Sequence, residues 1–310
     1  MVNLKPIKII IGGLDFAGKT SILTAFDKRY NFHDEIVELQ PTILIDYRTT
    51  EFLGKPFIFW DMGGQIRYRE LYESKQEMYF SDTDLLIYII DIQDSSRFEF
   101  SVGYLKKILK FFKNNEIDVP LIVVFHKFDP ELKDDEETTQ NMRYLTKEII
   151  SIEELKMLFV QTSIYDILSI VQLLSSALSI FDEKQIELKG LFEKYLRNFD
   201  CESLMLFDEN GVIVSEYYTA SLDFKSYLVL MKSIKEHIVL LKKMQEEKTE
   251  QDFDFNSIEK DIVSYLHRIE LKGKIFYVSA TIKEQAKEDL KNKLPSFLTD
   301  LTNILEPILT

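Results

Sequence analysis

Residues 13–20 decide which class of domain this chain forms. They read Gly-Leu-Asp-Phe-Ala-Gly-Lys-Thr and match the pattern GxxxxGK[ST] of a phosphate-binding loop. The apolar, β-rich run Ile7–Ile11 precedes the loop and a helical stretch, Lys19–Lys28, follows it, which is the context that such a loop requires. The pattern therefore predicts a nucleotide site on the first strand of an α/β domain, although the loop alone does not separate ATP from GTP.

The residue types in this loop predict how the phosphates are held. Backbone N–H groups converge on the α- and β-phosphates, and the field at the start of the following helix favours the anion. We expect Lys19 to reach the β- and γ-phosphates as a positive charge that also takes part in catalysis, and Thr20 to offer its hydroxyl to Mg²⁺. The other loop residues expected to contact the nucleotide are Gly13, Asp15, Phe16, Ala17, Gly18 and Ser21.

Apolar runs alternate with amphipathic stretches up to about residue 181. Amphipathic stretches lie near 97–113, 139–150 and 167–180, and the further runs are Phe57–Trp60, Leu85–Ile90, Leu121–Phe125 and Met157–Val160. This alternation predicts that residues 1–181 form an α/β domain with a mostly parallel sheet and helices on both faces. The pattern of apolar and polar residues in Thr42–Phe52 differs from that of the other runs, so we expect an antiparallel edge strand beside Phe57–Trp60. The turn Leu53-Gly54-Lys55-Pro56 would join the two strands.

The pattern of residues 182–310 predicts a separate α+β domain with an antiparallel sheet. Two hairpins are expected, the first around Asp208-Glu209-Asn210-Gly211 and the second around Lys272-Gly273. Their strands would be Glu202–Phe207 with Val212–Tyr218, and Ile262–Leu271 with Lys274–Thr281. The polar stretch Glu246–Asp254 is expected to be an exposed loop, and helices are expected at Asp182–Asn198, Leu222–Glu246 and Lys283–Leu305.

Two further segments are expected at the phosphate end of the site. The run Phe59–Gln65 ends a strand with Asp61 and continues as Met-Gly-Gly-Gln. We expect Asp61 to hold Mg²⁺ through water, the N–H of Gly64 to meet the γ-phosphate, and Gln65 to orient the attacking water as the catalytic glutamine. Thr42 follows Pro41 between the phosphate loop and Asp61, and we expect it to complete Mg²⁺ coordination, although Pro-Thr alone is typical of a turn.

Two segments are expected to read the base. In His126-Lys127-Phe128-Asp129, the Asp129 carboxylate is suited to accept hydrogen bonds from the guanine N1–H and exocyclic amine, which adenine does not offer. The Lys127 stem would lie over the base, and His126 would orient the loop and contact the base edge. Thr162-Ser163-Ile164 follows the last strand. Ser163 would brace Asp129 and the Ile164 amide would meet the guanine O6, although this tripeptide alone is equally typical of a turn.

Composition narrows the range of partners. The 310 residues include 52 acidic and 38 basic side chains, a net charge of −14, so we expect no nucleic-acid partner and no unaided binding to anionic membranes. A single cysteine, Cys201, fits a reducing cytoplasm. Because residue 2 is Val and the chain ends Glu-Pro-Ile-Leu-Thr, we expect neither myristoylation nor prenylation, and hence no direct membrane anchor.

These motifs carry a resemblance to small GTPases. The phosphate loop, Pro-Thr-Ile and Trp-Asp-Met-Gly-Gly-Gln resemble the Arf branch of the Ras-like GTPases, whereas His-Lys-Phe-Asp and Gln-Thr-Ser-Ile-Tyr-Asp are similar to the Rag/Gtr family. Leu196-Arg197-Asn198-Phe199, followed by Glu202–Phe207, resembles the start of the Rag/Gtr roadblock/longin-type dimerisation domain. The resemblance implies GTP or GDP with Mg²⁺, a homodimer or a heterodimer with a paralogous GTPase, activating and exchange proteins, and recruitment to membranes by partners.

Three functions remain open at this point. The first is a GTP-switched signalling or scaffolding GTPase with slow hydrolysis, because no arginine stands directly before Thr42 to supply a counter-charge. The second is an Arf-like trafficking GTPase, and the third is a nucleotide-binding scaffold that does not hydrolyse. For the C-terminal domain, a monomer whose apolar helical stripe covers its own sheet is the alternative to a dimer.

Overall fold

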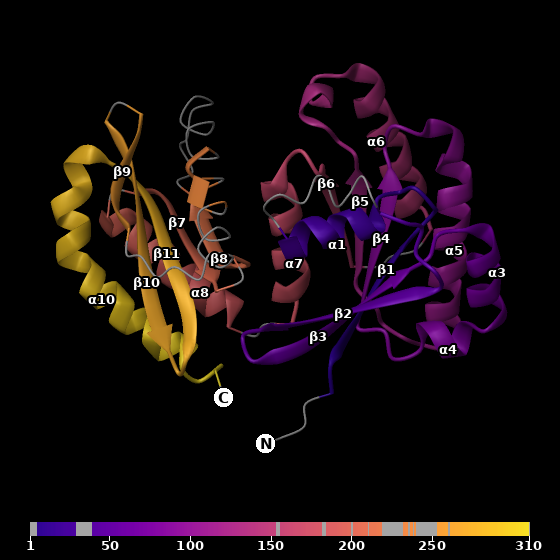
Figure 1. Cartoon of the computed structure of the whole chain (residues 1–310), viewed down its shortest axis with the longest axis horizontal. Coiled ribbons are helices and arrows are strands. Elements are labelled where there is room, and N and C mark those ends of the chain that lie inside the picture. Colours follow the sequence, from indigo (N-terminus) through magenta and orange to yellow (C-terminus); the bar gives the residue numbers. More distant parts are fainter. Residues whose placement is uncertain are drawn as a thin grey trace. The chain divides into compact units, whose positions relative to one another are not determined.

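The computed structural model describes residues 5–28, 39–152, 156–181, 184–199, 201–209, 211–218, 232–234, 236–237, 239, 253–259 and 261–309. The chain divides into two compact units, Met1–Leu173 and Leu174–Thr310 (Figure 1). The division falls within helix α7 (Ile167–Ser179), in the second half of which the Ser175 hydroxyl accepts a hydrogen bond from the Ile213 amide at 2.9 Å.

The first unit is built around a six-stranded sheet in the order β2-β3-β1-β4-β5-β6. All neighbouring pairs are parallel except β2 with β3, which confirms the predicted mostly parallel α/β fold and the antiparallel edge strand. The strands are β1 Ile7–Gly13, β2 Ile45–Phe52, β3 Lys55–Met62, β4 Leu85–Asp91, β5 Leu121–His126 and β6 Met157–Thr162. Besides α7, the α-helices among the described residues of this unit are α1 Lys19–Lys28, α3 Ile66–Ser74, α4 Gln76–Phe80, α5 Phe98–Asn114 and α6 Glu136–Ile150.

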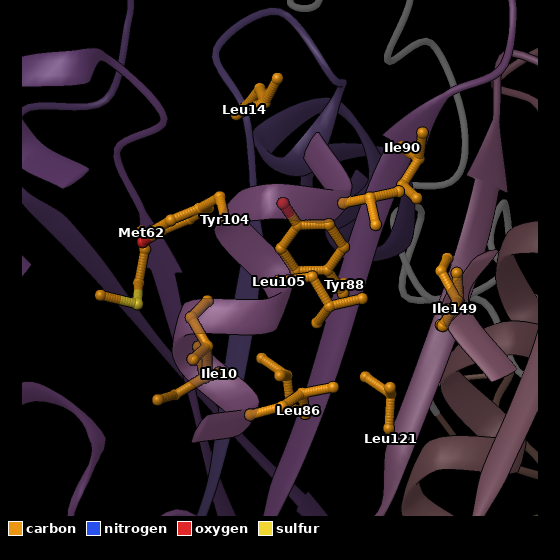
Figure 2. Packing of buried hydrophobic residues seen from close by; sticks show 14 of the residues in the cluster. Ile10, Leu14, Met62, Leu86, Tyr88, Ile90, Tyr104, Leu105, Leu121 and Ile149 are labelled. Atoms are coloured by element: carbon orange, nitrogen blue, oxygen red, sulfur yellow. The ribbon is translucent and has the colours of Figure 1, made fainter. Parts of the chain in front are cut away.

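Buried strands and helices α5 and α6 share the core of this unit. Ile10, Leu86 and Leu121 occupy matching register positions in β1, β4 and β5 and are buried. Figure 2 shows these three side chains below Tyr88, whose ring lies beside Leu105 of α5. Helices α1 and α7 lie on the opposite side of the sheet from α5 (Figure 1). Because both faces are covered, the central strands β1, β4 and β5 consist of nearly continuous apolar residues.

The β2–β3 hairpin is tighter than the sequence suggested. Its loop has only two residues, Leu53 with φ 48° and Gly54 with φ 78°, since Lys55 and Pro56 already belong to β3. Positive φ at both central residues matches the right-handed twist of the flanking strands. The strand β2 begins at Ile45 rather than at Thr42, which leaves Thr42 in the loop that faces the nucleotide site.

Trp60 of β3 is enclosed by neighbours on two strands. Tyr47 of β2 meets it edge-on, with ring centroids 5.0 Å apart, and Nζ of Lys8 lies 3.8 Å from the indole centroid. Lys8 Nζ also donates to the carbonyls of Tyr79 and Ser81, each at 2.8 Å, and burial lowers the pKa of Lys8 to about 8.

Helices α3 and α4 were missed by the sequence analysis. The segment is rich in charged and polar residues, and few of its side chains are buried: Tyr72 in α3, and Tyr79 and Phe80 in α4. The helical path is also interrupted at Lys75, where φ is −133° and ψ is 45°. Short helices with so few buried residues do not produce the apolar periodicity that predicts a helix.

The second unit contains a five-stranded antiparallel sheet in the order β8-β7-β11-β10-β9, as the predicted fold class requires. Its strands are β7 Cys201–Asp208, β8 Ile213–Tyr218, β9 Phe253–Glu259, β10 Ile262–Leu271 and β11 Lys274–Lys283, and its helices include α8 Gln185–Phe199 and α10 Lys287–Leu305. Helices α8 and α10 pack together through Phe192 and Phe297, whose ring centroids are 5.6 Å apart.

Two segments of this unit, around β9 and at 222–246, differ from the sequence predictions or lie largely outside the described residues. Strand β9 was missed: the loop expected at Glu246–Asp254 lies outside the described residues up to 252, but Phe253 and Asp254 already belong to β9. Most of the helix expected at Leu222–Glu246 also lies outside the described residues, while 232–234, 236–237 and 239 are helical. Among the helices that the structure describes in either unit, none has the length and apolar character needed to cross a membrane.

Candidate nucleotide-binding site

A cleft of about 540 Å³ lies at the carboxyl ends of the parallel strands. The segments that follow β1, β3, β4, β5 and β6 all contribute to it, together with the loop before β2. Ligands of open α/β sheets bind at this edge of the sheet. Every predicted site residue lines the cleft except four, which are themselves buried: Gly13, Ala17, Asp61 and Ser163.

Two glycines shape the phosphate loop after β1. Gly13 has φ +141°, and a Cβ there would lie 2.4 Å from the Ile89 carbonyl oxygen. Gly18 has φ +91°, and a Cβ there would lie 2.3 Å from Cδ2 of His126. Both positions therefore require glycine for conformation and for space. Phe16 is left-handed as well, with φ 62°, and its side chain is 75% exposed.

Lys19 is buried beneath this loop. Its Nζ donates to the Leu14 carbonyl oxygen at 2.6 Å. Burial lowers the pKa of Lys19 to about 8, and the nearby carboxylates of Asp61 and Asp15 oppose that shift. The ammonium group is thus held at the phosphate loop, where it can exchange a carbonyl oxygen for a phosphate oxygen.

Three oxygen-bearing side chains from separate segments converge beside Lys19. The Thr20 hydroxyl donates to Asp61 Oδ2 at 2.6 Å, and the Thr20 and Thr42 hydroxyls are 2.8 Å apart. Asp61 is fully buried, and its Oδ1 has no hydrogen-bond partner among the described residues. Burial raises the pKa of Asp61. A buried carboxylate oxygen without a partner, with two hydroxyls beside its other oxygen, fits a hard cation such as Mg²⁺ and its water ligands.

The turn after Asp61 packs directly on the phosphate loop. The Gly64 carbonyl oxygen accepts hydrogen bonds from the Asp15 amide at 3.1 Å and from Arg69 Nε at 2.9 Å. A Cβ on Gly64 would lie 2.3 Å from the Asp15 nitrogen, so no side chain fits there. In this structure the carbonyl of Gly64 contacts the phosphate loop, and the predicted contact of its N–H with a γ-phosphate stays a prediction. Gln65 is the N-cap residue of α3 and lines the cleft.

At the other end of the cleft, the predicted base-reading residues lie together. The Ser163 hydroxyl donates to Asp129 Oδ1 at 2.6 Å, which is the bracing contact expected of that pair. Lys127 has φ 60°, and its Nζ is 2.6 Å from Asp91 Oδ2. Ile164 lines the cleft beside them.

His126 is buried at the end of β5. Its Nδ1 is 2.9 Å from the Thr162 hydroxyl, and its ring edge faces Gly18 of the phosphate loop. Burial lowers the pKa of His126 to about 3, so the imidazole is neutral at pH 7. His126 therefore contacts both the end of β6 and the phosphate loop, while its expected roles in orienting the base loop and in contacting the base edge stay predictions.

The sequence analysis missed the last residue of β4, Asp91, and the segment between β4 and α5. Asp91 ion-pairs with Lys127, Gln93 donates through Nε2 to Asp129 Oδ2 at 3.0 Å, and Arg97 binds both the carbonyl and the carboxylate of Asp15. One short segment therefore contacts the base loop and the phosphate loop. No motif marks these residues, but their position at the carboxyl end of a parallel strand was a usable signal.

The sheet order and the phosphate loop define a Ras-like GTPase domain. A sequence model of the ADP-ribosylation factor family matches residues 1–178. The chain therefore belongs to the ADP-ribosylation factor family, whose members are GTP-binding switch proteins that bind GTP or GDP with Mg²⁺ and hydrolyse GTP.

The solved structures that resemble the chain include the Arl6 BBS3 small GTPase from Trypanosoma brucei with a bound nucleotide analogue, GppNp. The two chains are 19% identical. The match covers 56% of this chain and 98% of that one, with a TM-score of 0.43.

Proposed function

We propose that this protein is a switch that binds GTP in preference to ATP, hydrolyses it slowly with Mg²⁺, and dimerises through its C-terminal unit. The arrangement of the cleft carries the nucleotide part of the proposal. Thr20, Thr42 and Asp61 lie together at one end, and Asp129 lies braced by Ser163 at the other. A guanine nucleotide presents its groups in the same order, with metal-bound phosphates at one end and two base N–H donors at the other.

Lys19 and Gln65 have separate roles in the proposed reaction. Thr20, Thr42 and Asp61 would hold Mg²⁺, which when bound would supply positive charge against the phosphates. Lys19 exchanges its hydrogen bond with Leu14 for the β- and γ-phosphates, which holds them in place. Gln65, at the start of α3, orients the water that attacks the γ-phosphate.

We expect hydrolysis by the protein alone to be slow. An arginine that reaches the transferring phosphate accelerates this reaction by about 10³–10⁵. Arg69 and Arg97 approach the site, but Arg69 donates to the Gly64 carbonyl and Arg97 to Asp15. The expected unaided rate is therefore below about 10⁻² s⁻¹, the level reached when an arginine is supplied within the same chain. An activating protein would supply the missing charge.

The test combines nucleotide loading with single-turnover hydrolysis on the full chain. We expect bound GDP or GTP in preference to adenine nucleotides, and slow Mg²⁺-dependent conversion of GTP to GDP. Gln65→Leu should lower the rate while leaving GTP affinity unchanged, and Gln76→Leu, the same change at the start of α4 and outside the lining of the cleft, should alter neither. Equal affinity for ATP and GTP would contradict the base assignment, and absence of turnover would favour a non-hydrolysing scaffold.

The finer assignment to a Rag/Gtr-like protein is also a proposal. It is supported by the sequence His126-Lys127-Phe128-Asp129 and by a C-terminal unit with a five-stranded antiparallel sheet, which is compatible with a roadblock/longin-type dimerisation domain. Membership of the ADP-ribosylation factor family equally supports an Arf-like trafficking role. Binding of the isolated protein to membranes would favour trafficking, whereas stable pairing without membrane affinity would favour the Rag/Gtr-like assignment.

A further inference from the structure

Gln93 contributes to the base end of the cleft although no nucleotide-binding motif contains it. It follows β4 in the loop that leads to α5, and it lines the cleft. Its Nε2 donates to the Lys127 carbonyl oxygen at 2.8 Å and to Asp129 Oδ2 at 3.0 Å. Its own backbone is held by a hydrogen bond from the Gln93 amide to Asp91 Oδ1 at 3.0 Å. Because both side-chain partners are acceptors, the amide nitrogen rather than the oxygen has to face them.

The number of hydrogen bonds that the Asp129 carboxylate can accept indicates the role of Gln93. An ionised carboxylate offers about four lone-pair positions on its two oxygens. Ser163 occupies one position on Oδ1, and Gln93 occupies one on Oδ2. One position remains on each oxygen, and the guanine edge needs two, one for N1–H and one for the exocyclic amine. The two protein donors therefore leave the capacity that guanine requires.

We propose that Gln93 is a positioning residue for guanine recognition, and that it fixes the plane of the Asp129 carboxylate so that both oxygens accept from the base. This inference rests on the proposed GTP-binding function. Ser163 alone anchors a single oxygen, about which the carboxylate would be able to pivot. Gln93 anchors the other oxygen and, through the Lys127 carbonyl, the loop that carries Asp129.

A purely structural role for Gln93 gives a different expectation. If Gln93 only tied the Lys127 carbonyl to the β4–α5 loop, its loss would weaken every nucleotide that uses the base pocket by a similar factor. If Gln93 fixes the Asp129 carboxylate, its loss should lower the affinity mainly for nucleotides whose base donates to both oxygens. Inosine lacks the exocyclic amine and uses one oxygen, so comparing GDP with IDP separates the two roles.

The experiment measures dissociation constants of GDP and IDP for the full-length protein with Mg²⁺. Gln93→Met keeps the length of the side chain and removes the donor. It should weaken GDP binding about fivefold, the loss typical of one net hydrogen bond, and IDP binding by less than about twofold. Gln93→Glu places a second carboxylate against Asp129 and should weaken GDP binding further. Ser96→Ala is the control, because the Ser96 hydroxyl in the same loop donates to Asp94.

The outcomes separate this inference from the proposed function. Equal losses for GDP and IDP, or unchanged GDP affinity in both Gln93 variants, would overturn it while leaving GTP binding intact. A wild type that does not prefer GDP to IDP would overturn the base assignment and this inference together. Gln93 is exposed, so its variants should keep the melting temperature of the nucleotide-free protein. If Gln93→Met fails to fold, Gln93→Ala removes the same donor and gives the same comparison of GDP with IDP.

Discussion

At the scale of single residues, the site depends on polar side chains that are buried or braced before any ligand arrives. Asp61 is fully buried with an unpartnered Oδ1, and His126 is neutral and fixed between Thr162 and Gly18. Asp129 is held through both oxygens by Ser163 and Gln93. Such groups lose little conformational freedom on binding, so their hydrogen bonds contribute more of their energy to affinity and selectivity.

Asp129→Asn tests base selectivity at this scale. The substitution replaces an acceptor with a donor opposite the base amine, so guanosine binding should weaken by about 2–4 kcal/mol, the range for losing charged hydrogen bonds. Xanthosine nucleotides, which carry a carbonyl in place of that amine, should bind the variant better than guanosine nucleotides do. Competition binding of GDP against XDP checks both expectations, and an unchanged order of preference would contradict them.

At the scale of elements, the turn of the β10–β11 hairpin allows the effect of backbone conformation on stability to be measured without a change in side-chain packing. Its two-residue turn has positive φ at Lys272, 51°, and at Gly273, 78°. A Cβ at Gly273 meets nothing within 4 Å, so Gly273→Ala costs only backbone strain. We expect a loss of about 1–2 kcal/mol in the free energy of unfolding of this unit, measured by urea denaturation.

Gly190 is the matched control for this prediction. It lies in the same unit, within α8, and a Cβ there also meets nothing within 4 Å. Gly190→Ala should stabilise the unit by about 0.8–1 kcal/mol, because alanine has the higher helix propensity. Two glycine-to-alanine changes in open space should therefore shift stability in opposite directions. Equal shifts would contradict the backbone argument.

The elements also show where sequence reasoning succeeds. Strands β4, β5 and β6 begin at the predicted residues Leu85, Leu121 and Met157. Strands β4 and β5 are buried parallel strands, which require continuous apolar runs, whereas β6 is a partly exposed edge strand that begins with an apolar run of its own. Their ends were underestimated, since β4 and β5 continue into the polar residues Asp91 and His126. Strand β9 was missed because Phe253–Glu259 lies in an acidic stretch that reads as a loop.

The residues of the candidate site also divide into those that the sequence predicted and those that it did not. Residues within the phosphate loop and the other motifs were found, because short spacings fix their geometry. Arg97 and Gln93 were not, because the segment after β4 carries no recognised motif, and their partners Asp15 and Asp129 are 82 and 36 residues away. Only the folded sheet brings such residues together, so no local pattern records them.

At the scale of the whole molecule, the edge strands of the C-terminal sheet lead us to expect that the protein self-associates. Within the described strands, β8 and β9 stand at the two ends of the sheet, each hydrogen-bonded to a neighbour on one side. Such edges favour pairing with another chain unless they are covered. We expect light scattering at tens of micromolar to show a dimer of the full chain with either GDP or a GTP analogue.

The same measurement separates the possible partners. A monomer under both conditions would contradict the homodimer. A dimer that forms only when a paralogous GTPase is added would support the heterodimer instead.

The pH dependence of stability is also a property of the whole chain. His237 is buried, its Nδ1 is 2.7 Å from the Ser279 hydroxyl, and burial lowers the pKa of His237 from 6.5 to about 4. Between those two values the unfolded chain binds the proton and the folded chain does not. Stability should therefore fall as the pH falls from about 6.5 to 4, by about 3 kcal/mol from this histidine, and its contribution should level off below that window.

His237→Asn tests this assignment. Asparagine places a hydrogen-bonding group near the position of Nδ1 but does not titrate, so the variant should lose this part of the pH dependence. Urea denaturation at several pH values between 4 and 7 measures the slope. An unchanged slope in the variant would assign the acid sensitivity to other groups, with His126 as the first alternative because its pKa is lowered to about 3.

Trp60 is the single tryptophan of the chain, so the intrinsic tryptophan fluorescence of the protein reports on one position. The indole lies directly before Asp61 on β3, with Tyr47 at its edge and the Lys8 ammonium 3.8 Å from its centroid. Indole emission is sensitive to a nearby cation and to an aromatic neighbour. Any displacement of the β2–β3 hairpin relative to β1 should therefore change the fluorescence of one identified residue, and the time course of nucleotide loading can be followed in the unlabelled protein.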